Sequence, residues 1–316
     1  MFKRKLPNDD YAQFTGLDVQ KVSGRNGAEK IAYHISGKLD DGRTPLICLA
    51  DYYRNMADFA GFVGRFHAIF DTDWPIVLID LAGRGRSDDR ANKSSYTTGD
   101  DAKDVINVAA MLGIEQAVFL GQGHGGRVIM ALGGLNPNLI CASILIDSAP
   151  VLYAPGIVRL RDNLSTLLSL KNQKHFLIAA KKIFALPHPL ANEKQLTQII
   201  ERAFYRSKSG RYRPLFDKAL LAKLNGIEIS DVFEPQWPLF ATLNNAPMML
   251  MRTQLSDQLE RATFEYMGNL RSDAVLLAIE AQGSPALLSN DDEVGSIADF
   301  VQHSSKLSAC RAIVSG

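Results

Sequence analysis

The chain alternates between short apolar runs and segments with helical spacing, and this alternation constrains its fold more than any other feature. Seven runs rich in β-branched residues predict strands at residues 30–36, 45–50, 75–80, 116–120, 141–147, 247–252 and 274–279. The intervening stretches at residues 57–70, 100–112 and 124–132 carry apolar residues at helical spacing. Right-handed crossovers usually join such strands into a mainly parallel sheet. The sequence therefore predicts a doubly wound α/β fold.

The alternation stops after residue 147 and resumes only at residue 247. The interval contains helix-like stretches at residues 158–170, 174–184 and 193–205, separated by prolines and Gly210. We therefore expect a core formed by residues 1–149 and 246–316, with a helical cap inserted at residues 150–245. Such a cap would lie over the carboxyl edge of the sheet, where open α/β sheets bind ligands.

The overall charge gives no reason to expect nucleic acid or an anionic membrane as a partner. The chain has 35 basic and 34 acidic residues, a formal net charge of +1. Within residues 151–240, however, there are 14 basic and 7 acidic residues, a net +7. Solvated helix faces explain this excess most simply, and attraction of an anionic ligand or an acidic partner is the functional alternative.

The ends and the cysteines indicate a cytoplasmic protein without metal or cofactor. Residues 1–11 are charged and lack the apolar stretch of a signal peptide, and no run of about 18 apolar residues occurs. The three cysteines, Cys48, Cys141 and Cys310, are too few and too scattered for a disulfide framework. No pair of cysteines or cluster of cysteine and histidine has the spacing of a zinc site.

Four segments occur in an order that is typical of one superfamily. The predicted strand at residues 46–49 is followed by Ala50-Asp51-Tyr52, and residues 80–87 match the pattern D-x-x-G-x-G-x-S. Residues 121–126 (GQGHGG) join a predicted strand to a predicted helix, and residues 252–257 follow a later strand. From about residue 30 onward the chain resembles capped members of the α/β-hydrolase superfamily. The resemblance implies the α/β-hydrolase fold and a site built for a nucleophile, a histidine and an acid.

The residue at the nucleophile position is Gly123. In the family the motif G-x-S-x-G lifts a serine oxygen above the sheet, and the next backbone N–H helps to hold the oxyanion. Glycine has no side-chain atom that can attack a carbonyl, so no acyl-enzyme can form there. Ala50, Asp51, Tyr52, Gln122 and His124 are the candidates for the oxyanion site and the pocket. Asp51 would place negative charge beside the oxyanion site, which opposes the stabilisation that such catalysis requires.

The catalytic histidine is also missing. Relatives usually carry it in the loop after the last core strand, where this chain has Gly283-Ser284-Pro285. A serine hydroxyl cannot act as a general base near neutral pH, whereas imidazole can. His303 lies far downstream and is interpreted as a surface or packing residue. Asp257 stands at the acid position, with Asp147 as the alternative acid, and without imidazole to orient, each is expected to have a structural role.

These substitutions favour a pseudoenzyme that binds a small apolar or anionic molecule, or a protein partner, between cap and core. The apolar residues expected to contribute to that cavity or to the cap interior are Leu164, Leu167, Leu168, Phe176, Phe184, Phe204, Tyr205, Phe216 and Trp237. The basic residues expected at its entrance, around Gly210, are Arg206, Lys208, Arg211 and Arg213.

Two other interpretations remain open. The first is an enzyme with relocated chemistry, in which His124 takes part in proton transfer without a covalent intermediate. The second is a dinucleotide-binding oxidoreductase, because Gly121, Gly123 and Gly126 satisfy G-x-G-x-x-G after a predicted strand, with Asp147 about one βα unit later.

Overall fold

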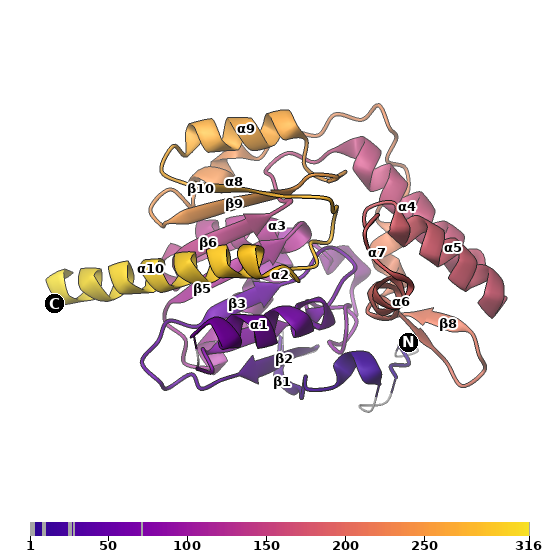
Figure 1. Cartoon of the computed structure of the whole chain (residues 1–316), viewed down its shortest axis with the longest axis horizontal. Coiled ribbons are helices and arrows are strands. Elements are labelled where there is room, and N and C mark those ends of the chain that lie inside the picture. The colour runs from indigo at the N-terminus through magenta and orange to yellow at the C-terminus, as the bar shows by residue number, and fades with distance from the viewer. Residues whose placement is uncertain (1–3, 8–10, 25–26, 28, 71, 316) are drawn as a thin grey trace.

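A mostly parallel eight-stranded sheet forms the centre of the molecule, as a computed structural model shows for residues 4–7, 11–24, 27, 29–70 and 72–315 (Figure 1). The strands are β1 (Gln20–Ser23), β2 (Lys30–Ser36), β3 (Leu46–Leu49), β4 (Ile76–Ile79), β5 (Ala117–Gln122), β6 (Ile140–Ile146), β9 (Met248–Thr253) and β10 (Val275–Ile279). Their order is β1-β2-β4-β3-β5-β6-β9-β10. Within this sheet, as far as the chain is described, β1 pairs antiparallel with β2 and β2 with β4, and the other neighbours are parallel. The predicted α/β-hydrolase architecture is confirmed.

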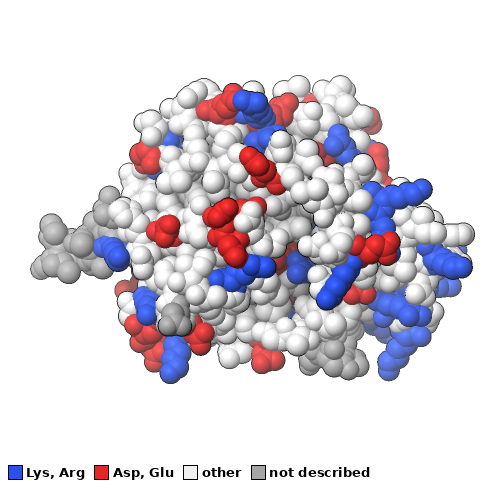
Figure 2. Space-filling view, in the orientation of Figure 1, with Lys and Arg blue, Asp and Glu red and all other residues white. Residues whose placement is uncertain are grey.

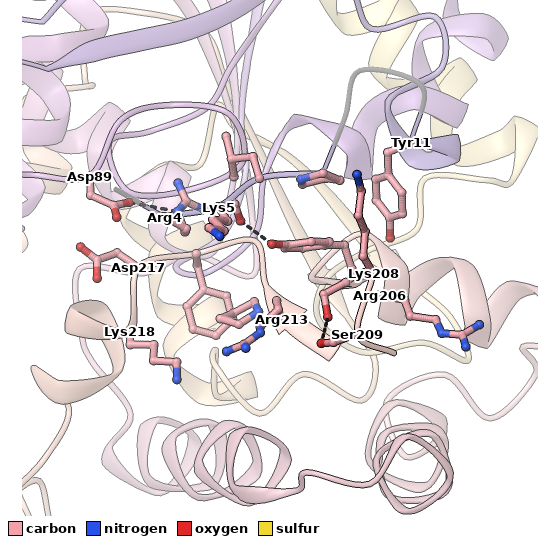
Figure 3. Close-up of a pocket in the computed structure, with 16 residues that line it drawn as sticks. Arg4, Lys5, Tyr11, Asp89, Arg206, Lys208, Ser209, Arg213, Asp217 and Lys218 are labelled. Carbon is pink, nitrogen blue, oxygen red and sulfur yellow. Dashed lines mark hydrogen bonds and ion pairs between the residues drawn. The ribbon is translucent and has the colours of Figure 1, made fainter. Parts of the chain in front are cut away.

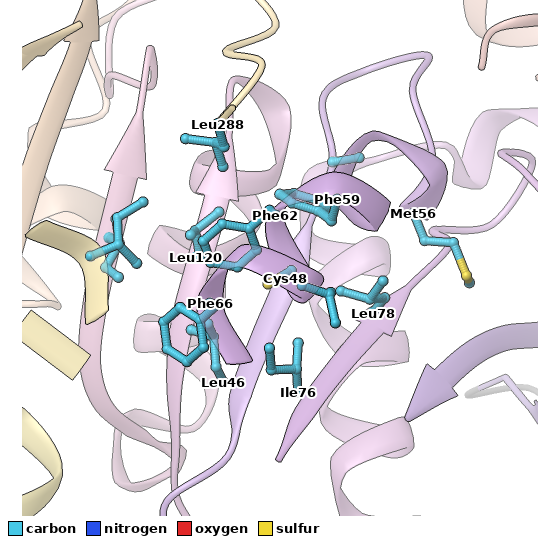
Figure 4. Packing of buried hydrophobic residues seen from close by; sticks show 14 of the residues in the cluster. Leu46, Cys48, Met56, Phe59, Phe62, Phe66, Ile76, Leu78, Leu120 and Leu288 are labelled. Carbon is cyan, nitrogen blue, oxygen red and sulfur yellow. The ribbon is translucent and has the colours of Figure 1, made fainter. Parts of the chain in front are cut away.

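Helices cover both faces of this sheet. The helices of the core are α1 (Ala60–Phe70), α2 (Thr98–Met111), α3 (His124–Leu135), α8 (Trp237–Ala241), α9 (Arg261–Leu270) and α10 (Asp291–Ser315). The helices α1 and α10 pack on one face, and α2, α3, α8 and α9 pack on the other. Figure 4 shows the first of these interfaces, where aromatic rings meet the aliphatic side chains of β3, β4 and β5. Burial of these faces fixes the strand ends that carry the site.

One strand of the sheet was not predicted from the sequence. The strand β1 reads Gln-Lys-Val-Ser and pairs antiparallel with β2 at the edge of the sheet. An edge strand needs only one apolar face, and four mostly polar residues carry too weak a periodic signal to be recognised. No helix of the described residues is both long and apolar enough to cross a membrane.

The segment between β6 and β9 is mainly helical. Its last helix, α8, packs on the sheet although residues 150–245 were all expected in the cap. The elements before it are α4 (Ala154–Ser169), α5 (Gln173–Ala185), α6 (Glu193–Glu201), the hairpin strands β7 (Phe204–Arg206) and β8 (Tyr212–Pro214), and α7 (Lys218–Ala222). The hairpin falls partly in a stretch that was predicted to be helical, at residues 193–205. These elements have an apolar cluster of their own, which includes Phe176, Phe204 and Phe216. They stand beside the carboxyl ends of the parallel strands (Figure 1).

Buried polar side chains join this cap to the core. Arg54 pairs with Asp58, Nε to Oδ2 at 2.7 Å, and donates from Nη1 to the carbonyl oxygen of Ile199 in α6 at 3.2 Å. Asn55 donates to the carbonyl oxygen of Arg202 at 2.6 Å. His188 is buried beside this pair, and neither ring nitrogen has a hydrogen-bond partner among the described residues. Its burial, together with the Arg54 charge, lowers the pKa of His188 to about 4.

His188 should therefore make stability depend on pH in a defined window. Because its folded pKa is depressed, its contribution is present above the unfolded pKa of about 6.5 and is lost as pH falls towards 4. The expected loss is about 3 kcal/mol in the free energy of unfolding. His188→Phe should remove this part of the pH dependence, as measured by urea denaturation between pH 7 and pH 4. His303→Phe, on an exposed position of α10, is the control. An equal pH dependence in wild type and His188→Phe would contradict the assignment.

Candidate ligand site

A cavity of about 660 Å³ lies between cap and core. Its core wall comes from the loops after β3, β4, β5, β9 and β10, and its cap wall comes from α4, α5 and the segment after α7. Leu164, Leu167 and Phe184 line it, as the sequence suggested. The other apolar residues expected there from the sequence do not: Leu168, Phe176, Phe204 and Phe216 pack in the cap cluster, Trp237 packs against the core, and Tyr205 lines a separate cavity.

Gly123 occupies the sharp turn between β5 and α3, with φ +50° and ψ −111°. The neighbouring glycines allow the backbone of α3 to approach β3 and β5 closely. A Cβ atom at Gly121 would lie 2.4 Å from the backbone nitrogen of Gly126, and one at Gly125 would lie 2.3 Å from the carbonyl oxygen of Leu49. These contacts explain the glycine run through the approach of helix to strand, without a dinucleotide. The strand order also differs from that of a Rossmann sheet, so the dinucleotide interpretation gains no support.

The Asp51 carboxylate fills the space in front of Gly123. A Cβ atom at Gly123 would lie only 2.1 Å from Asp51 Oδ1. The same oxygen accepts a hydrogen bond from the backbone N–H of His124 at 2.8 Å, and Oδ2 accepts one from Gln258 Nε2 at 2.6 Å. Gly123 is the centre of this turn, called the elbow from here on because serine hydrolases carry their nucleophile on such a turn. The His124 N–H directly follows it and is the donor that would stabilise an oxyanion in a serine hydrolase. In this chain the Asp51 carboxylate already accepts the hydrogen bond of that N–H group.

At the position expected for the histidine, Ser284 donates from Oγ to Asp147 Oδ2 at 2.6 Å. Asp147 also accepts from the Thr253 backbone N–H at 2.9 Å and from Thr253 Oγ1 at 2.5 Å. Burial raises the pKa of Asp147, although these hydrogen bonds oppose the shift. Asp257 instead accepts from Arg159 of the cap at 3.3 Å. Of the two candidate acids, it is therefore Asp147 that contacts Ser284.

The remaining candidate residues near the elbow either line the cavity or support the loops around it. Tyr52 lines the cavity, donates from its hydroxyl to the carbonyl oxygen of Leu220 at 3.0 Å and meets the His124 ring edge-on at 5.4 Å. Ala50 is buried at the end of β3. Gln122 does not line the cavity, because its amide donates to the carbonyl oxygen of Ala286. It supports the loop that carries Ser284.

His124 forms part of a buried charged network that the sequence did not reveal. Its Nε2 lies 2.9 Å from Asp101 Oδ2, and Asp101 also pairs with Arg84 at 3.1 Å and Arg90 at 3.0 Å. Burial alone would raise the pKa of Asp101, but Arg84, His124 and Arg90 bring it down to about 2. Burial lowers the pKa of His124, and Arg84 adds to this shift. The arrangement orients a neutral imidazole at the cavity wall.

The loop at residues 80–87 presents Arg84 to this network. Asp80 accepts from the backbone N–H groups of Met56 at 2.8 Å and Arg86 at 2.7 Å. Gly85 has φ +50°, and a Cβ atom there would collide with the Asp80 carboxylate. The D-x-x-G-x-G-x-S pattern thus encodes a rigid turn in which Arg84 points into the cavity wall.

Arg127 is a second cavity residue that sequence reasoning missed. It lies one turn into α3, lines the cavity and is partly exposed. No carboxylate among the described residues lies within ion-pair distance of its guanidinium, and burial lowers its pKa, opposed by the Asp51 charge. One signal in the sequence could have identified Arg127 as a cavity residue. It stands four residues after Gly123, and side chains at this spacing lie on the same face of a helix. No group of three or more metal-ligating side chains occurs in the described part of the chain.

The basic residues around Gly210 do not lie at the entrance of this cavity, contrary to the sequence-based expectation. Arg206, Lys208 and Arg213 line a second cavity, between the β7–β8 hairpin and residues 4–7, and Arg211 lines neither cavity. Successive side chains of a strand point to opposite faces. The positions of these basic residues in the sequence therefore did not reveal which face of the hairpin each of them occupies. Figure 2 shows lysine and arginine side chains gathered over the cap, at the right of the view.

Comparisons with known proteins agree with this architecture. A sequence model described as the α/β hydrolase fold matches residues 58–190. A 3-hydroxybutyrate-oligomer hydrolase of Cupriavidus necator is 28% identical over 134 residues, which cover 42% of this chain and 44% of that protein. The chain spans about half the length of the curated relatives it matches.

Solved structures share nearly the whole fold. An α/β hydrolase from Novosphingobium aromaticivorans superposes with a TM-score of 0.77 at 23% identity, over 90% of this chain and 98% of that chain. An E-2-(acetamidomethylene)succinate hydrolase gives a TM-score of 0.71 at 17% identity, over 90% and 99%. The sheet order, the geometry of the turn at Gly123 and the sequence model matched at residues 58–190 together show the α/β-hydrolase fold in this chain.

Proposed function

We propose that this protein is a non-catalytic member of the superfamily that binds a small molecule between cap and core. The observation that carries the proposal is the Asp51 carboxylate, which accepts the His124 N–H and fills the space above Gly123. Acyl transfer needs a nucleophile at this point and a free donor for the developing oxyanion. The chain offers neither group in the expected place, and Ser284 occupies the position of the base.

The cavity chemistry suggests the class of ligand. Aliphatic and aromatic side chains of α4 and α5 provide apolar walls, which suit an acyl or alkyl body. Asp101 is balanced by Arg84 and Arg90, and Asp257 by Arg159. Arg127 remains as the cation without an ion-pair partner among the described residues. We therefore propose a ligand with an apolar body and one anionic group near Arg127.

A second candidate function rests on the His124–Asp101 contact. A histidine oriented by a carboxylate at a cavity wall is the usual arrangement of a general base. It would activate water or remove a proton without a covalent intermediate. Turnover of any ester that disappears in His124→Phe and persists in Gln258→Ala would favour this alternative over simple binding.

We also propose a reducing, cytoplasmic location. Cys48 is a buried free thiol, Cys141 is buried, and the side chain of Cys310 lies outside the described residues. Burial strongly raises the pKa of Cys48, so this thiol is a packing residue. The location is tested by fractionating cells that express the full chain.

The purified protein should not behave as a serine hydrolase. We expect no hydrolysis of p-nitrophenyl butyrate above the rate without enzyme and no covalent labelling by a fluorophosphonate, measured by intact-protein mass spectrometry. The reason is the missing nucleophile at Gly123 and the occupied oxyanion donor. An active serine esterase is the positive control. Stoichiometric labelling of one serine would overturn the proposal.

A side chain at position 123 should destabilise the protein, because its Cβ atom would collide with the Asp51 carboxylate. Gly123→Ala must displace the carboxylate and strain a positive-φ position, so we expect a loss of about 3 kcal/mol in the free energy of unfolding. In an Asp51→Ala background the loss should be about 1–2 kcal/mol smaller. Gly113→Ala is the matched control, because Gly113 has φ +68° and open space at its Cβ position. Its cost should be equal in both backgrounds, and equal costs for Gly123→Ala as well would refute the contact.

Arg127 should discriminate between charged and neutral ligands. We expect Arg127→Met to weaken octanoate binding about tenfold, because one charge-assisted interaction is lost, while 1-octanol binding stays within about twofold. Isothermal titration calorimetry measures both affinities. Arg261→Met, on an exposed position of α9, is the control and should change neither. Equal octanoate affinity in wild type and Arg127→Met would contradict the proposed anionic contact.

A further inference from the structure

A second cavity, of about 1010 Å³, lies between the N-terminal segment Arg4–Pro7 and the β7–β8 hairpin. It shares no lining residue with the cavity above Gly123. Figure 3 shows Arg4 and Lys5 from the first segment, and Lys208 and Arg213 from the hairpin, around this space. The hairpin side chains reach solvent, so the cavity is open to the surface.

The lining is strongly basic. Six basic side chains face two acidic ones, namely Arg4, Lys5, Arg206, Lys208, Arg213 and Lys218 against Asp89 and Asp217. Both carboxylates are already engaged. Asp89 pairs with Arg4 at 3.0 Å, and Asp217 accepts from the Tyr96 hydroxyl at 2.6 Å and pairs with Lys93. The other five cations have no ion-pair partner within the described ranges of the chain.

The cations stand on a rigid and partly apolar frame. Tyr205 donates from its hydroxyl to the carbonyl oxygen of Lys5, and Arg4 donates to the carbonyl oxygens of Leu215 and Ser87. The hairpin is further held by antiparallel pairing of Tyr205 with Arg213. The apolar lining comes from Leu6, Pro7, Tyr11, Tyr205, Pro214 and Phe216. Because the segment and the hairpin are hydrogen-bonded to each other, the site is formed without a ligand.

We propose that this second cavity binds a phosphate-bearing anion with an apolar portion. Five uncompensated cations around one space repel each other, and an anion with more than one negative charge relieves that repulsion better than a single carboxylate. Arginine forks and lysine ammonium groups are the side chains that bind phosphate oxygens. The apolar lining would contact the organic part of the ligand. A soluble organic phosphate and a phospholipid headgroup both carry this chemistry.

Binding of inorganic pyrophosphate, measured by calorimetry at low and moderate salt, tests the phosphate contact. We expect wild type to bind, with affinity that falls as salt rises. The double variant Lys208→Ser/Arg213→Ser should weaken binding at least tenfold. Arg211→Ser, on the same hairpin but outside the cavity lining, should stay within about twofold. Circular dichroism and thermal melting confirm that each variant is folded, and octanoate binding above Gly123 should be unchanged, which separates this test from the proposed function.

Vesicles distinguish the two ligand sources. Wild type that binds pyrophosphate and also sediments with phosphatidic acid vesicles, but not with phosphatidylcholine vesicles, supports a lipid headgroup. Binding of pyrophosphate without sedimentation supports a soluble organic phosphate. Absence of pyrophosphate binding in wild type, or equal weakening by Arg211→Ser and Lys208→Ser/Arg213→Ser, would overturn the proposal.

Discussion

The hydrogen bond from the His124 backbone to the Asp51 carboxylate is the interaction around which the site is organised. It joins the loop after β3 to the first turn of α3, and Gln258 adds the loop after β9. A residue with a Cβ atom at position 123 could not coexist with this carboxylate in its present place. Gly123 and Asp51 therefore depend on each other. The Asp51 carboxylate accepts the hydrogen bond of the His124 N–H, the group that would stabilise the oxyanion of the transition state in a serine hydrolase.

A comparable contact forms at Ser284, the position at which the sequence resemblance predicts a histidine. The Ser284 hydroxyl donates to Asp147, which also accepts from the backbone and side chain of Thr253. A buried carboxylate that lost its imidazole partner without replacement would be costly. The Ser284 hydrogen bond thus keeps the loop after β10 attached to β6 and β9. Asp51 and Ser284 thus make structural contacts at the edge of the cavity between cap and core, which both residues line.

The fold and the place of Gly123 at the turn after β5 could be predicted from the sequence, because they rest on local signals. Periodicity marked the parallel strands, and the glycine turn after β5 has a motif of its own. Other features depend on tertiary contacts. The partner of His124 is Asp101, a residue in the first turn of α2 that reads as an ordinary helix-start acid. Three further features depend on how distant segments pack. They are which of Asp147 and Asp257 contacts Ser284, whether the Arg127 side chain lines the cavity, and which cavity the basic residues of the hairpin line.

The most direct test of the account is the NMR chemical shift of the His124 backbone amide proton. A hydrogen bond to a carboxylate is short and charge-assisted, so this proton should resonate far downfield in wild type. In Asp51→Ala the signal should move strongly upfield, while the amide of Gly113, far from the site, should not move. An unchanged His124 signal in Asp51→Ala would contradict this prediction, because it would show that the Asp51 carboxylate does not accept the hydrogen bond of the His124 N–H.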